Sequence, residues 1–536
     1  MSFRILVTDD IDPEGVAVLL GTPEFEVDEV PTLAKDVLLE RIGDYDAIVG
    51  RSATRISEDV LRHASRLRVV GRAGVGVDNV ALDVATELGI AVINAPAGNT
   101  VAVAELLFGA LIGLLRHIPR ATASVHDGRW ERTDLLGAEL KGQTLGIVGL
   151  GRIGGEVAHR AHAFGMTVVA YDPYVTDERF AALCVTRLAT LDALLDAATI
   201  VTVHTPLTDE TTGMIGAREL ARLARGSVVA NLARGGIIEE TALIAGLRSG
   251  HVGGAAVDAF TKEPLVGNHP FRGVPHLLLT PHIGASTAEA QRNVAVDVCL
   301  AVKDALLRNE LSRSLNVAAT DGASWGELQP AFALVQRAAA VARAVLADRG
   351  ARAVSWLSVR CGPEFAGSAD ALLSAAAVGA LDGITESERL NMINARALAE
   401  ARGITLSVSV SQLAPEPHAI EVTLSDGTTE FRVAGTAPPA GTPRLTRIGA
   451  FHVDVNPRQT LIVLTNHDVP GVIGRVGTVL GDAKVNIAEY HQARLAQGGD
   501  ALAAISVDGR VAEPIRQLLL KLPDVRSATI VHFRPA

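Results

Sequence analysis

The sequence predicts an α/β protein of several domains, and three observations carry this prediction. The chain has 536 residues, which is too many for one hydrophobic core and enough for about three to five domains of roughly 100–200 residues. Up to residue 310, short β-branched runs alternate with segments of helical periodicity, a pattern typical of parallel sheets with crossover helices. The remaining residues change to an α+β order and then to the order βαββαβ, so we expect two further, smaller domains.

Composition limits the classes of partner. Apolar residues make up 48% and charged residues 20%, and we expect no apolar run as long as the ~18 residues of a membrane span. The start "MSFRILVTDD" lacks the features of a signal peptide. Three scattered cysteines without metal-ligand spacing are typical of a reducing cytoplasm and predict no metal site. The net charge of -11 includes no basic stripe, which argues against nucleic acid. We therefore expect a soluble, cytoplasmic protein.

The first 310 residues contain the runs expected to form strands, and these runs fall into two groups. They are "RILVTD", "DAIVG", "RVVGRAG", "AVINAP", "TLGIVGLG", "TVVAYDP", "IVTVHTP", "SVVANLA", "GGAAVDAF" and "HLLLTPH". Between the groups, residues 99–118 are apolar nearly all round, which predicts one long buried helix that joins two lobes. The βα pattern on both sides predicts a cleft between the lobes, and such clefts bind ligands. The same apolar helix suggests a homodimer formed through the second lobe.

The last third of the chain predicts two modules. An Ala-rich helix followed by "TLSVSV", "AIEVTLS" and "EFRVAG" predicts an α+β module over residues 318–455. From residue 459 the order is strand "TLIVLTN", helix "GVIGRVGTVLGDA", strands "VNIAEYHQAR" and "DALAAISVDG", helix "VAEPIRQLLLKL" and strand "VRSATIVHF". This βαββαβ order is the ferredoxin-like unit, which is often used for regulation.

A glycine-rich turn predicts a dinucleotide site in the second lobe. In "TLGIVGLGRIGGEV", Gly149, Gly151 and Gly154 follow a strand and open a helix. The first glycine would make a tight turn, the second would let the backbone approach a pyrophosphate, and the third would let helix and strand pack closely. The next strand ends in Asp172, the acid expected to hold a ribose diol. Because Pro173 and Tyr174 follow instead of an arginine for a 2′-phosphate, the preferred cofactor is NAD.

Polar side chains follow three other strands of this lobe. "NLARGG" presents Arg234, "DAFTKEP" presents Asp258 and Glu263, and "TPHIGAS" presents His282. Strand ends in open α/β sheets are where ligands bind. Taken singly, each side chain is explained as a surface cation, a solvated acid or a turn residue. Together they have a chemical logic: an arginine binds a substrate carboxylate, and a carboxylate beside an imidazole orients it for proton transfer with a hydroxyl.

These motifs resemble a known family. "GLGRIG", "NLARGG", "DAFTKEP" and "TPHIGAS", in this order, resemble the D-isomer-specific 2-hydroxyacid dehydrogenases over residues 1–315. "RSATRI", "VVGRAGVGVDNVAL", "NAPAGNTVAVAELLFGALI" and "TPHIGASTAEAQ" resemble, more narrowly, the long-form D-3-phosphoglycerate dehydrogenases. The resemblance implies two Rossmann-like or flavodoxin-like lobes, an intervening domain of the allosteric-substrate-binding type, and a terminal ACT domain. The implied domains are residues 1–98 with 285–315 for substrate, 99–284 for NAD, 318–455 and 459–536.

The resemblance also implies roles for individual residues. His282 would be the acid/base, Glu263 its partner, and Arg234 the group that binds the carboxylate and polarises the carbonyl. The cofactor would be lined by Gly149, Gly151, Arg152, Ile153, Gly154, Asp172, Thr205, Pro206, Leu232, Ala233, Asp258, Gly284 and Ala285. The substrate would be faced by Arg51, Arg72, Gly74, Val75, Gly76 and Asn99. Arg129 and Arg132 are weaker candidates for the substrate phosphate, reaching from a neighbouring subunit; as solvated loop charges they need no function.

The implied activity is oxidation of 3-phospho-D-glycerate to 3-phosphohydroxypyruvate, the first step of L-serine biosynthesis, by a homodimer or homotetramer. In the terminal unit, Asn466, His467 and Asp468 end one strand and Asn486 begins the next. Asp468 alone would be explained as a helix cap. In an ACT domain, Asn466, Asp468 and Asn486 would bind L-serine as a feedback effector, with the middle domain as relay and as the place of a second effector site.

Two alternatives remain open from the residues. One is another D-2-hydroxyacid dehydrogenase, such as a glyoxylate or hydroxypyruvate reductase; a regulatory tail favours a committed biosynthetic step over such a reductase. The other is an NAD-sensing interaction protein in which hydride transfer is incidental. The complete set of Arg234, Glu263 and His282 argues against it, and a turnover assay would decide.

Overall fold

The first lobe is built on a five-stranded parallel sheet. The computed structural model describes residues 2–321, 323–351, 353–382, 389–411, 416–439 and 441–533. The elements of this lobe are β1 (Phe3–Val7), α1 (Pro13–Leu20), β2 (Phe25–Glu29), α2 (Lys35–Arg41), η1 (Ile42–Asp44), β3 (Ala47–Gly50), α3 (Glu58–His63), β4 (Val69–Arg72), α4 (Leu82–Glu87) and β5 (Ala91–Asn94). The strand order is β2-β1-β3-β4-β5, a flavodoxin-like order. Helix α12 (Ala288–Arg308), which follows the second lobe in the sequence, packs onto α1 and β4. The first lobe is therefore built from residues that precede and residues that follow the second lobe.

The second lobe is built on a seven-stranded parallel sheet. Its elements are α5 (Thr100–Leu115), α6 (Ile118–His126), η2 (Thr133–Leu135), β6 (Thr144–Val148), α7 (Arg152–Ala163), β7 (Thr167–Tyr171), α8 (Asp177–Ala182), β8 (Thr186–Arg187), α9 (Leu191–Ala197), β9 (Ile200–Val203), α10 (Ala217–Arg222), β10 (Ser227–Asn231), α11 (Glu240–Arg248), β11 (Val252–Val257) and β12 (Leu277–Leu279). The order is β12-β11-β10-β9-β6-β7-β8. The strand order reverses between β6 and β9, and ligands bind at the carboxyl ends of strands at such a point.

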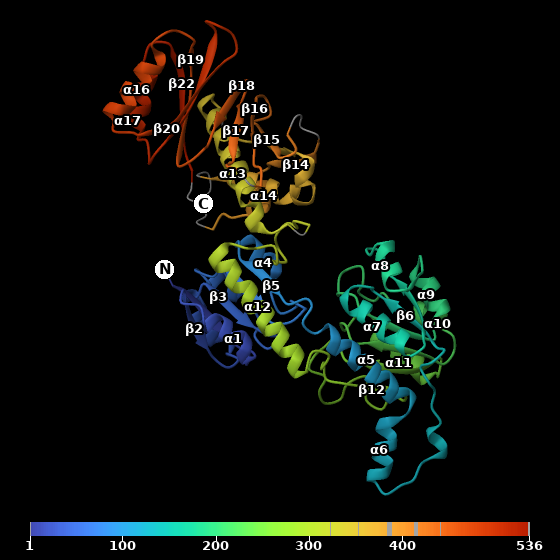
Figure 1. Cartoon of the computed structure of the whole chain (residues 1–536). Helices are drawn as coiled ribbons and strands as arrows, with labels where there is room; N and C mark the ends of the chain where they lie inside the picture. Colours follow the sequence, from blue (N-terminus) through green and yellow to red (C-terminus); the bar gives the residue numbers. More distant parts are fainter. Residues whose placement is uncertain are drawn as a thin grey trace.

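The predicted long helix over residues 99–118 is shorter in the structure. Helix α5 ends at Leu115, because His117 takes a left-handed φ of 54°. The chain bends by 61° into α6, which projects from the second lobe (Figure 1). The prediction is therefore correct for the buried part and wrong for its end, where the apolar residue Ile118 is exposed instead.

The third body contains a six-stranded mixed sheet covered by helices. Its elements are α13 (Trp325–Asp348), β13 (Trp356–Cys361), η3 (Pro363–Ser368), α14 (Ala369–Leu381), α15 (Ala395–Ala401), β14 (Thr405–Val410), β15 (Ala419–Ser425), β16 (Glu430–Thr436), β17 (Arg444–Ile448) and β18 (Phe451–Val455). The order is β14-β13-β15-β16-β17-β18, with β13 and β14 parallel and the other pairs antiparallel. The expected α+β character is thus present.

The fourth body is the predicted βαββαβ unit. It consists of β19 (Thr460–His467), α16 (Val472–Asp482), β20 (Ile487–Arg494), β21 (Asp500–Val507), α17 (Glu513–Leu520) and β22 (Val525–His532). Its antiparallel sheet has the order β20-β21-β19-β22, the order of a ferredoxin-like fold. Figure 1 shows the third and fourth bodies stacked beyond the first lobe, away from the second lobe.

Within the part of the chain that the structure describes, two helices reach membrane length, which the sequence analysis did not expect. Residues Trp325–Asp348 and Pro363–Leu381 are long and apolar enough to cross a bilayer. However, 61% and 78% of these windows are buried inside the molecule, where α13 and α14 pack on each other and on the six-stranded sheet. Their apolar character is therefore accounted for by a protein core.

Candidate active site

The histidine at the end of β12 is held by a carboxylate. His282 has a left-handed φ of 53°, and its Nδ1 lies 2.9 and 2.8 Å from the two carboxylate oxygens of Glu263. The backbone N–H of Phe260 donates to Glu263 Oε1 at 2.9 Å, which fixes the carboxylate in turn. With Nδ1–H donated to Glu263, Nε2 of His282 is free to exchange a proton with a ligand.

A buried acid shapes the loop that carries His282. Asp258, at the end of β11, is 1% exposed. Its carboxylate accepts from Thr280 Oγ1 at 2.6 Å and from the backbone N–H groups of Ile283 and Gly284, each at 2.8 Å. Because these three donors flank His282, the acid sets the path of the backbone there. A contact of Asp258 with the cofactor stays a prediction.

Arg234 reaches across the cleft from the end of β10. Its Nη1 donates to its neighbour Ala233 O at 2.8 Å, and its Nε donates to Asp78 of the first lobe at 3.1 Å. Asn231 shapes this turn, since its side chain bonds Arg234 O and the N–H of Ala233. The guanidinium is thereby oriented before any ligand binds.

The three glycines of the predicted dinucleotide turn have distinct environments. Gly149 has a φ of +93°, and a Cβ on Gly154 would lie 2.1 Å from the carbonyl oxygen of Gly149. A Cβ on Gly151 would meet no protein atom within 4 Å, so the space beside this residue is open. Helix α7 starts there without a side-chain cap, which leaves its first N–H groups for an anion. These residues fit the pyrophosphate of NAD.

Asp172 lies at the end of β7, beside this turn. Its carboxylate accepts from the backbone N–H groups of Leu150 at 2.8 Å and Tyr174 at 2.9 Å. The acid is therefore part of the dinucleotide turn itself, in the position predicted for a ribose contact.

A cavity of about 480 Å³ lies between the lobes. Its lining includes the predicted residues Val75, Gly76, Asn99, Arg152, Ile153, Thr205, Pro206, Leu232, Ala233, Arg234, His282, Gly284 and Ala285. Three residues of the lining each have a buried side-chain atom without a hydrogen-bond partner among the described residues: Asn99 Oδ1, His204 Nδ1 and Thr205 Oγ1. Burial lowers the pKa of His204 to about 4, so its ring is neutral at physiological pH. Unpaired buried polar atoms are costly, which marks this lining as a candidate site for a polar ligand.

Other predicted substrate residues lie beside the cavity lining. Arg51 and Arg72 line a separate, small hollow of the first lobe. Arg51 donates to Gln291 at 3.1 Å. Arg72 packs against Gly74, where an added Cβ would lie 1.4 Å from its Nη1, and its Nε is buried with no hydrogen-bond partner in the described ranges. Burial, followed by the charge of Arg234, lowers the pKa of Arg72 to about 10; the group is charged at neutral pH and close to the cleft.

The sequence analysis missed two acids of this region. Asp78 pairs with Arg234, and Asp9, at the end of β1, is 7% exposed. Asp9 accepts from the N–H of Arg51 at 2.8 Å, from Thr54 N and Oγ1 at 2.9 and 2.6 Å, and from Thr32 Oγ1 at 2.8 Å. It thereby fixes the loop that carries Arg51. Its position directly after the first strand was the available signal.

Comparisons with known proteins agree with this geometry. Residues 108–284 match the D-isomer specific 2-hydroxyacid dehydrogenase, NAD binding domain, and residues 353–449 match the D-3-phosphoglycerate dehydrogenase intervening domain. A D-3-phosphoglycerate dehydrogenase of Bacillus subtilis is 36% identical over 99% of this chain and 100% of its own length. The chain belongs to the D-3-phosphoglycerate dehydrogenase family. Its predicted NAD-dependent dehydrogenase activity on D-2-hydroxy acids is thereby confirmed, as is NAD as the cofactor.

Two further relatives differ in how much of this chain they match. A D-3-phosphoglycerate dehydrogenase of Methanocaldococcus jannaschii is 34% identical over 99% of this chain and all of its own. A solved glyoxylate reductase from Paecilomyes thermophila is 29% identical with a TM-score of 0.54. The match covers 98% of the reductase but only 59% of this chain. The two lobes are thus shared with other dehydrogenases, whereas the full length is shared with the D-3-phosphoglycerate dehydrogenases.

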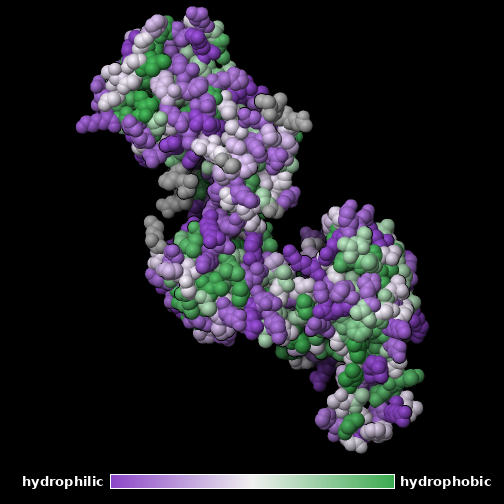
Figure 2. Space-filling view, viewed as in Figure 1, coloured by the Kyte–Doolittle hydropathy of each residue, from purple (hydrophilic) through white to green (hydrophobic). Residues whose placement is uncertain are grey.

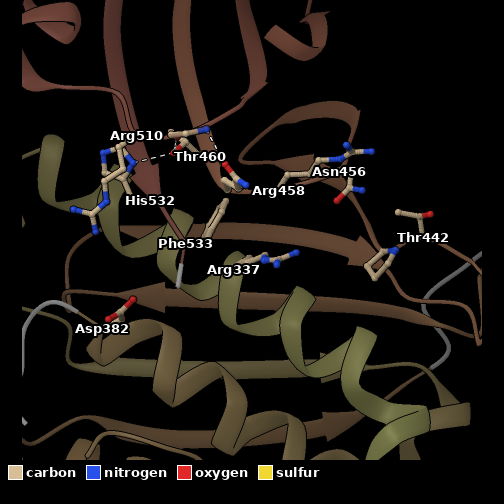
Figure 3. A pocket seen from close by; sticks show the side chains of 12 residues that line it. Arg337, Asp382, Thr442, Asn456, Arg458, Thr460, Arg510, His532 and Phe533 are labelled. Atoms are coloured by element: carbon tan, nitrogen blue, oxygen red, sulfur yellow. Dashed lines mark hydrogen bonds between the residues drawn. The ribbon is translucent and has the colours of Figure 1, made fainter. Parts of the chain in front are cut away.

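A second cavity lies between the third and fourth bodies of this family member. It measures about 910 Å³ and has three arginines in its lining, Arg337, Arg458 and Arg510. Figure 3 shows Arg337 on α13 on one side, with Arg458, Arg510 and His532 on the side of the terminal unit. His532 bonds Thr460 Oγ1 at 2.9 Å through Nδ1.

The predicted effector residues lie at two ends of the terminal sheet. Asn466 is 1% exposed; its Nδ2 donates to His467 O at 2.6 Å, and its Oδ1 accepts from Gln492 at 3.2 Å. Asp468 accepts from Gly498 N–H and Arg494, which lower its pKa. Asn486 donates to Asp508 at 2.6 Å. In β21, Ala501 pairs with Asn466 and Val507 with Ile487, so the two asparagines of one chain are separated by about 20 Å at ~3.3 Å per residue.

Proposed function

We propose that the chain oxidises 3-phospho-D-glycerate to 3-phosphohydroxypyruvate with NAD and so opens L-serine synthesis. The observation that carries this proposal is that His282, paired with Glu263, and Arg234 line one cavity, within a chain related over its full length to D-3-phosphoglycerate dehydrogenases. NAD, when bound, supplies the hydride acceptor. The residues of the chain provide binding and proton transfer.

Each of the three residues has one proposed role. Arg234 binds the substrate carboxylate and, as the hydroxyl becomes a carbonyl, polarises its oxygen. His282 accepts the hydroxyl proton at Nε2. Glu263 holds Nδ1–H, which fixes the tautomer and stabilises the imidazolium that forms. Gly149, Gly151 and Gly154 with the start of α7 hold the pyrophosphate, and Asp172 holds the ribose of the adenosine.

We propose that the substrate phosphate binds beside Arg51 and Arg72 of the first lobe. Arg72 has an unpaired, buried Nε, and Arg51 stands on a loop fixed by Asp9. Arg51→Ala should therefore raise the KM for 3-phosphoglycerate far more than the KM for D-glycerate, which lacks the phosphate. Equal increases for both substrates would assign Arg51 to the fold instead.

We further infer that the functional molecule is a homo-oligomer. The segment from α6 to residue 140 projects from the second lobe (Figure 2) and exposes apolar side chains: Trp130 is 83% and Leu136 is 89% exposed. A second copy would bury these residues. Arg129 and Arg132 lie on the same segment, so the copy could bring them to its neighbour's cleft. Sedimentation of the intact chain and of Trp130→Ser tests this inference.

L-Serine is the proposed feedback effector, at Asn466, Asp468 and Asn486. The separation of these residues within one chain favours a site shared by two chains. The cavity lined by Arg337, Arg458 and Arg510 is proposed as a second site, for an anionic effector, at the junction of the relay domain and the terminal unit. Location in the cytoplasm remains part of the proposal.

A single assay tests the central proposal. Purified protein with NAD is offered 3-phosphoglycerate, D-glycerate or glycolate, and NADH formation is followed while L-serine is titrated separately. A clear preference for 3-phosphoglycerate supports the proposed substrate; preference for an unphosphorylated acid would favour the glyoxylate or hydroxypyruvate reductase alternative.

A further inference from the structure

An ion pair joins the two lobes at the mouth of the active-site cavity. Asp78 follows β4 of the first lobe, and Arg234 follows β10 of the second. Asp78 Oδ2 lies 3.1 Å from Arg234 Nε. Among the ion pairs of the described residues, this is the one that links the five-stranded and seven-stranded bodies. Both residues line the cavity that contains His282.

The pair cannot be explained by stability alone. The side chain of Asp78 is 67% exposed and that of Arg234 is 26% exposed. Exposed ion pairs contribute only about 0–1 kcal/mol to folding. A role in fixing the direction of the guanidinium is more consistent with a place beside the proposed reacting groups.

The contacts of Arg234 divide its donors into two sets. Nε donates to Asp78, and Nη1 donates to Ala233 O. Nη2 makes no hydrogen bond with any described residue and faces Gly76, where an added Cβ would lie 1.9 Å away. Any side chain at residue 76 would therefore displace the guanidinium. Nη2 lies beside Gly76, which lines the cavity, on the same edge of the guanidinium as the Nε that Asp78 holds.

Electrostatics give Asp78 a second effect on the same cluster. Arg72 and Arg234 approach from the two lobes, and their charges repel. Burial and then the charge of Arg234 lower the pKa of Arg72, whereas Asp78 acts in the opposite direction. The carboxylate thus partly neutralises two cations that would otherwise repel each other across the cleft.

We propose that Asp78 is a positioning residue for the reaction: it holds Arg234 through Nε, so that Nη2 is directed at the substrate carboxylate when the two lobes meet. This inference rests on the proposed role of Arg234. Because donor and acceptor belong to different lobes, the orientation of the guanidinium depends on the arrangement of the lobes. Misplacement of a binding group by about 1 Å can cost on the order of 10²-fold in rate.

The test compares three variants, and kcat/KM for 3-phosphoglycerate is measured at high NAD. Asp78→Ala should lower kcat/KM for 3-phosphoglycerate about 10- to 100-fold, while the KM for NAD and the melting temperature stay close to those of the parent. Asp78→Asn retains an oxygen that accepts from Nε, and it should recover most of the loss. Asp83→Ala, which removes an exposed acid of the same lobe, is the matched control and should change neither parameter.

A double variant shows whether Asp78 acts through Arg234. Equilibrium binding of 3-phosphoglycerate to the enzyme saturated with NADH is measured, since this needs no turnover. Asp78→Ala should weaken binding in the parent but not in Arg234→Ala, because no guanidinium is left to orient. Equal weakening in both backgrounds would overturn the inference, as would an Asp78→Ala variant with parental kcat/KM.

The same measurements separate this inference from the proposed function. If Arg234→Ala itself binds and turns over 3-phosphoglycerate normally, the role of Arg234 is wrong. If Arg234→Ala is impaired and Asp78→Ala is not, only the positioning role of Asp78 is wrong. Equal losses for Asp78→Asn and Asp78→Ala, together with a lower melting temperature, would show that Asp78 supports the fold instead.

Discussion

Three polar side chains of the inter-lobe cleft lack, among the described residues, the hydrogen-bond partners that the proposed effector residues of the terminal sheet have. In the cleft, Asn99 Oδ1, His204 Nδ1 and Thr205 Oγ1 are buried and make no hydrogen bond with a residue that the structure describes. In the terminal unit, Asn466, Asp468 and Asn486 each have a hydrogen-bond partner within the chain. Unpaired groups in a cavity lower the cost of binding a polar ligand, since nothing has to be broken first. One chain therefore presents a preformed catalytic cleft, whereas the proposed effector site needs a second chain or a rearrangement.

The largest expected effect concerns the reacting histidine. His282 and His276 both have a φ of 53°, and asparagine tolerates this conformation. His282→Asn should reduce kcat by roughly 10²–10⁴-fold, with the dissociation constant for NAD unchanged in a fluorescence titration. His276→Asn, a change at an exposed histidine with the same backbone angle, should be close to the parent. Near-normal turnover of His282→Asn would remove the acid/base assignment.

The choice of cofactor should depend on Asp172. Asp172→Ala removes the negative charge expected to repel a 2′-phosphate, and losing a hydrogen bond to a charged group costs about 1.5–3 kcal/mol. The ratio of kcat/KM for NAD to that for NADP should fall by roughly ten- to hundredfold. The ratio within one variant is independent of how much active protein it contains. An unchanged ratio would mean that Asp172 only caps the turn through Leu150 and Tyr174.

Two glycines of one turn should respond differently to the same methyl group. Gly151→Ala meets no protein atom within 4 Å, so its melting temperature should equal that of the parent, whereas NAD binding should weaken about tenfold, ~1.4 kcal/mol. Gly154→Ala places a Cβ 2.1 Å from Gly149 O and should destabilise the lobe by about 1–3 kcal/mol. Thermal melts with and without NAD check both. Unaltered NAD binding by Gly151→Ala would move the pyrophosphate away from this residue.

The smallest effect on turnover is expected from substitutions in the terminal unit. Mixed oligomers of two variants test whether the proposed effector site is shared by two chains. Asn466→Ala and Asn486→Ala should each abolish inhibition by L-serine, a coupling of about 1–3 kcal/mol. Co-expression of the two variants should restore partial inhibition, because a shared site in a mixed dimer can combine two intact halves. Inhibition that stays absent in the mixed oligomer, while the parent is inhibited, would place the site within one chain.

In the first 310 residues the sequence predicted the strands with a continuous apolar run and missed two that lack one; in the third body it also left β13, β17 and β18 unnamed. Strand β2, with the sequence FEVDE, alternates with acids at the edge of its sheet, and β8 has only Thr186–Arg187 at the other sheet's edge. Edge strands are exposed on one side and need no apolar run. The end of the helix over residues 99–118 was missed for a related reason: apolar residues on a projecting segment give the same pattern as buried ones.

The sequence by itself predicted the parts of the site that are formed by residues close together along the chain. The Gly149–Gly154 turn, Asp172 and the strand-end positions of Arg234, Glu263 and His282 follow from a strand, a turn and a helix that are adjacent along the chain. What only the tertiary structure decided are contacts between distant segments. Asp78 and Arg234 are 156 residues apart, and Asp9 and Arg51 are 42 apart. The physical reason is that backbone geometry propagates locally, whereas a side-chain pair across a cleft exists only after two separate cores have packed and set the distance between them.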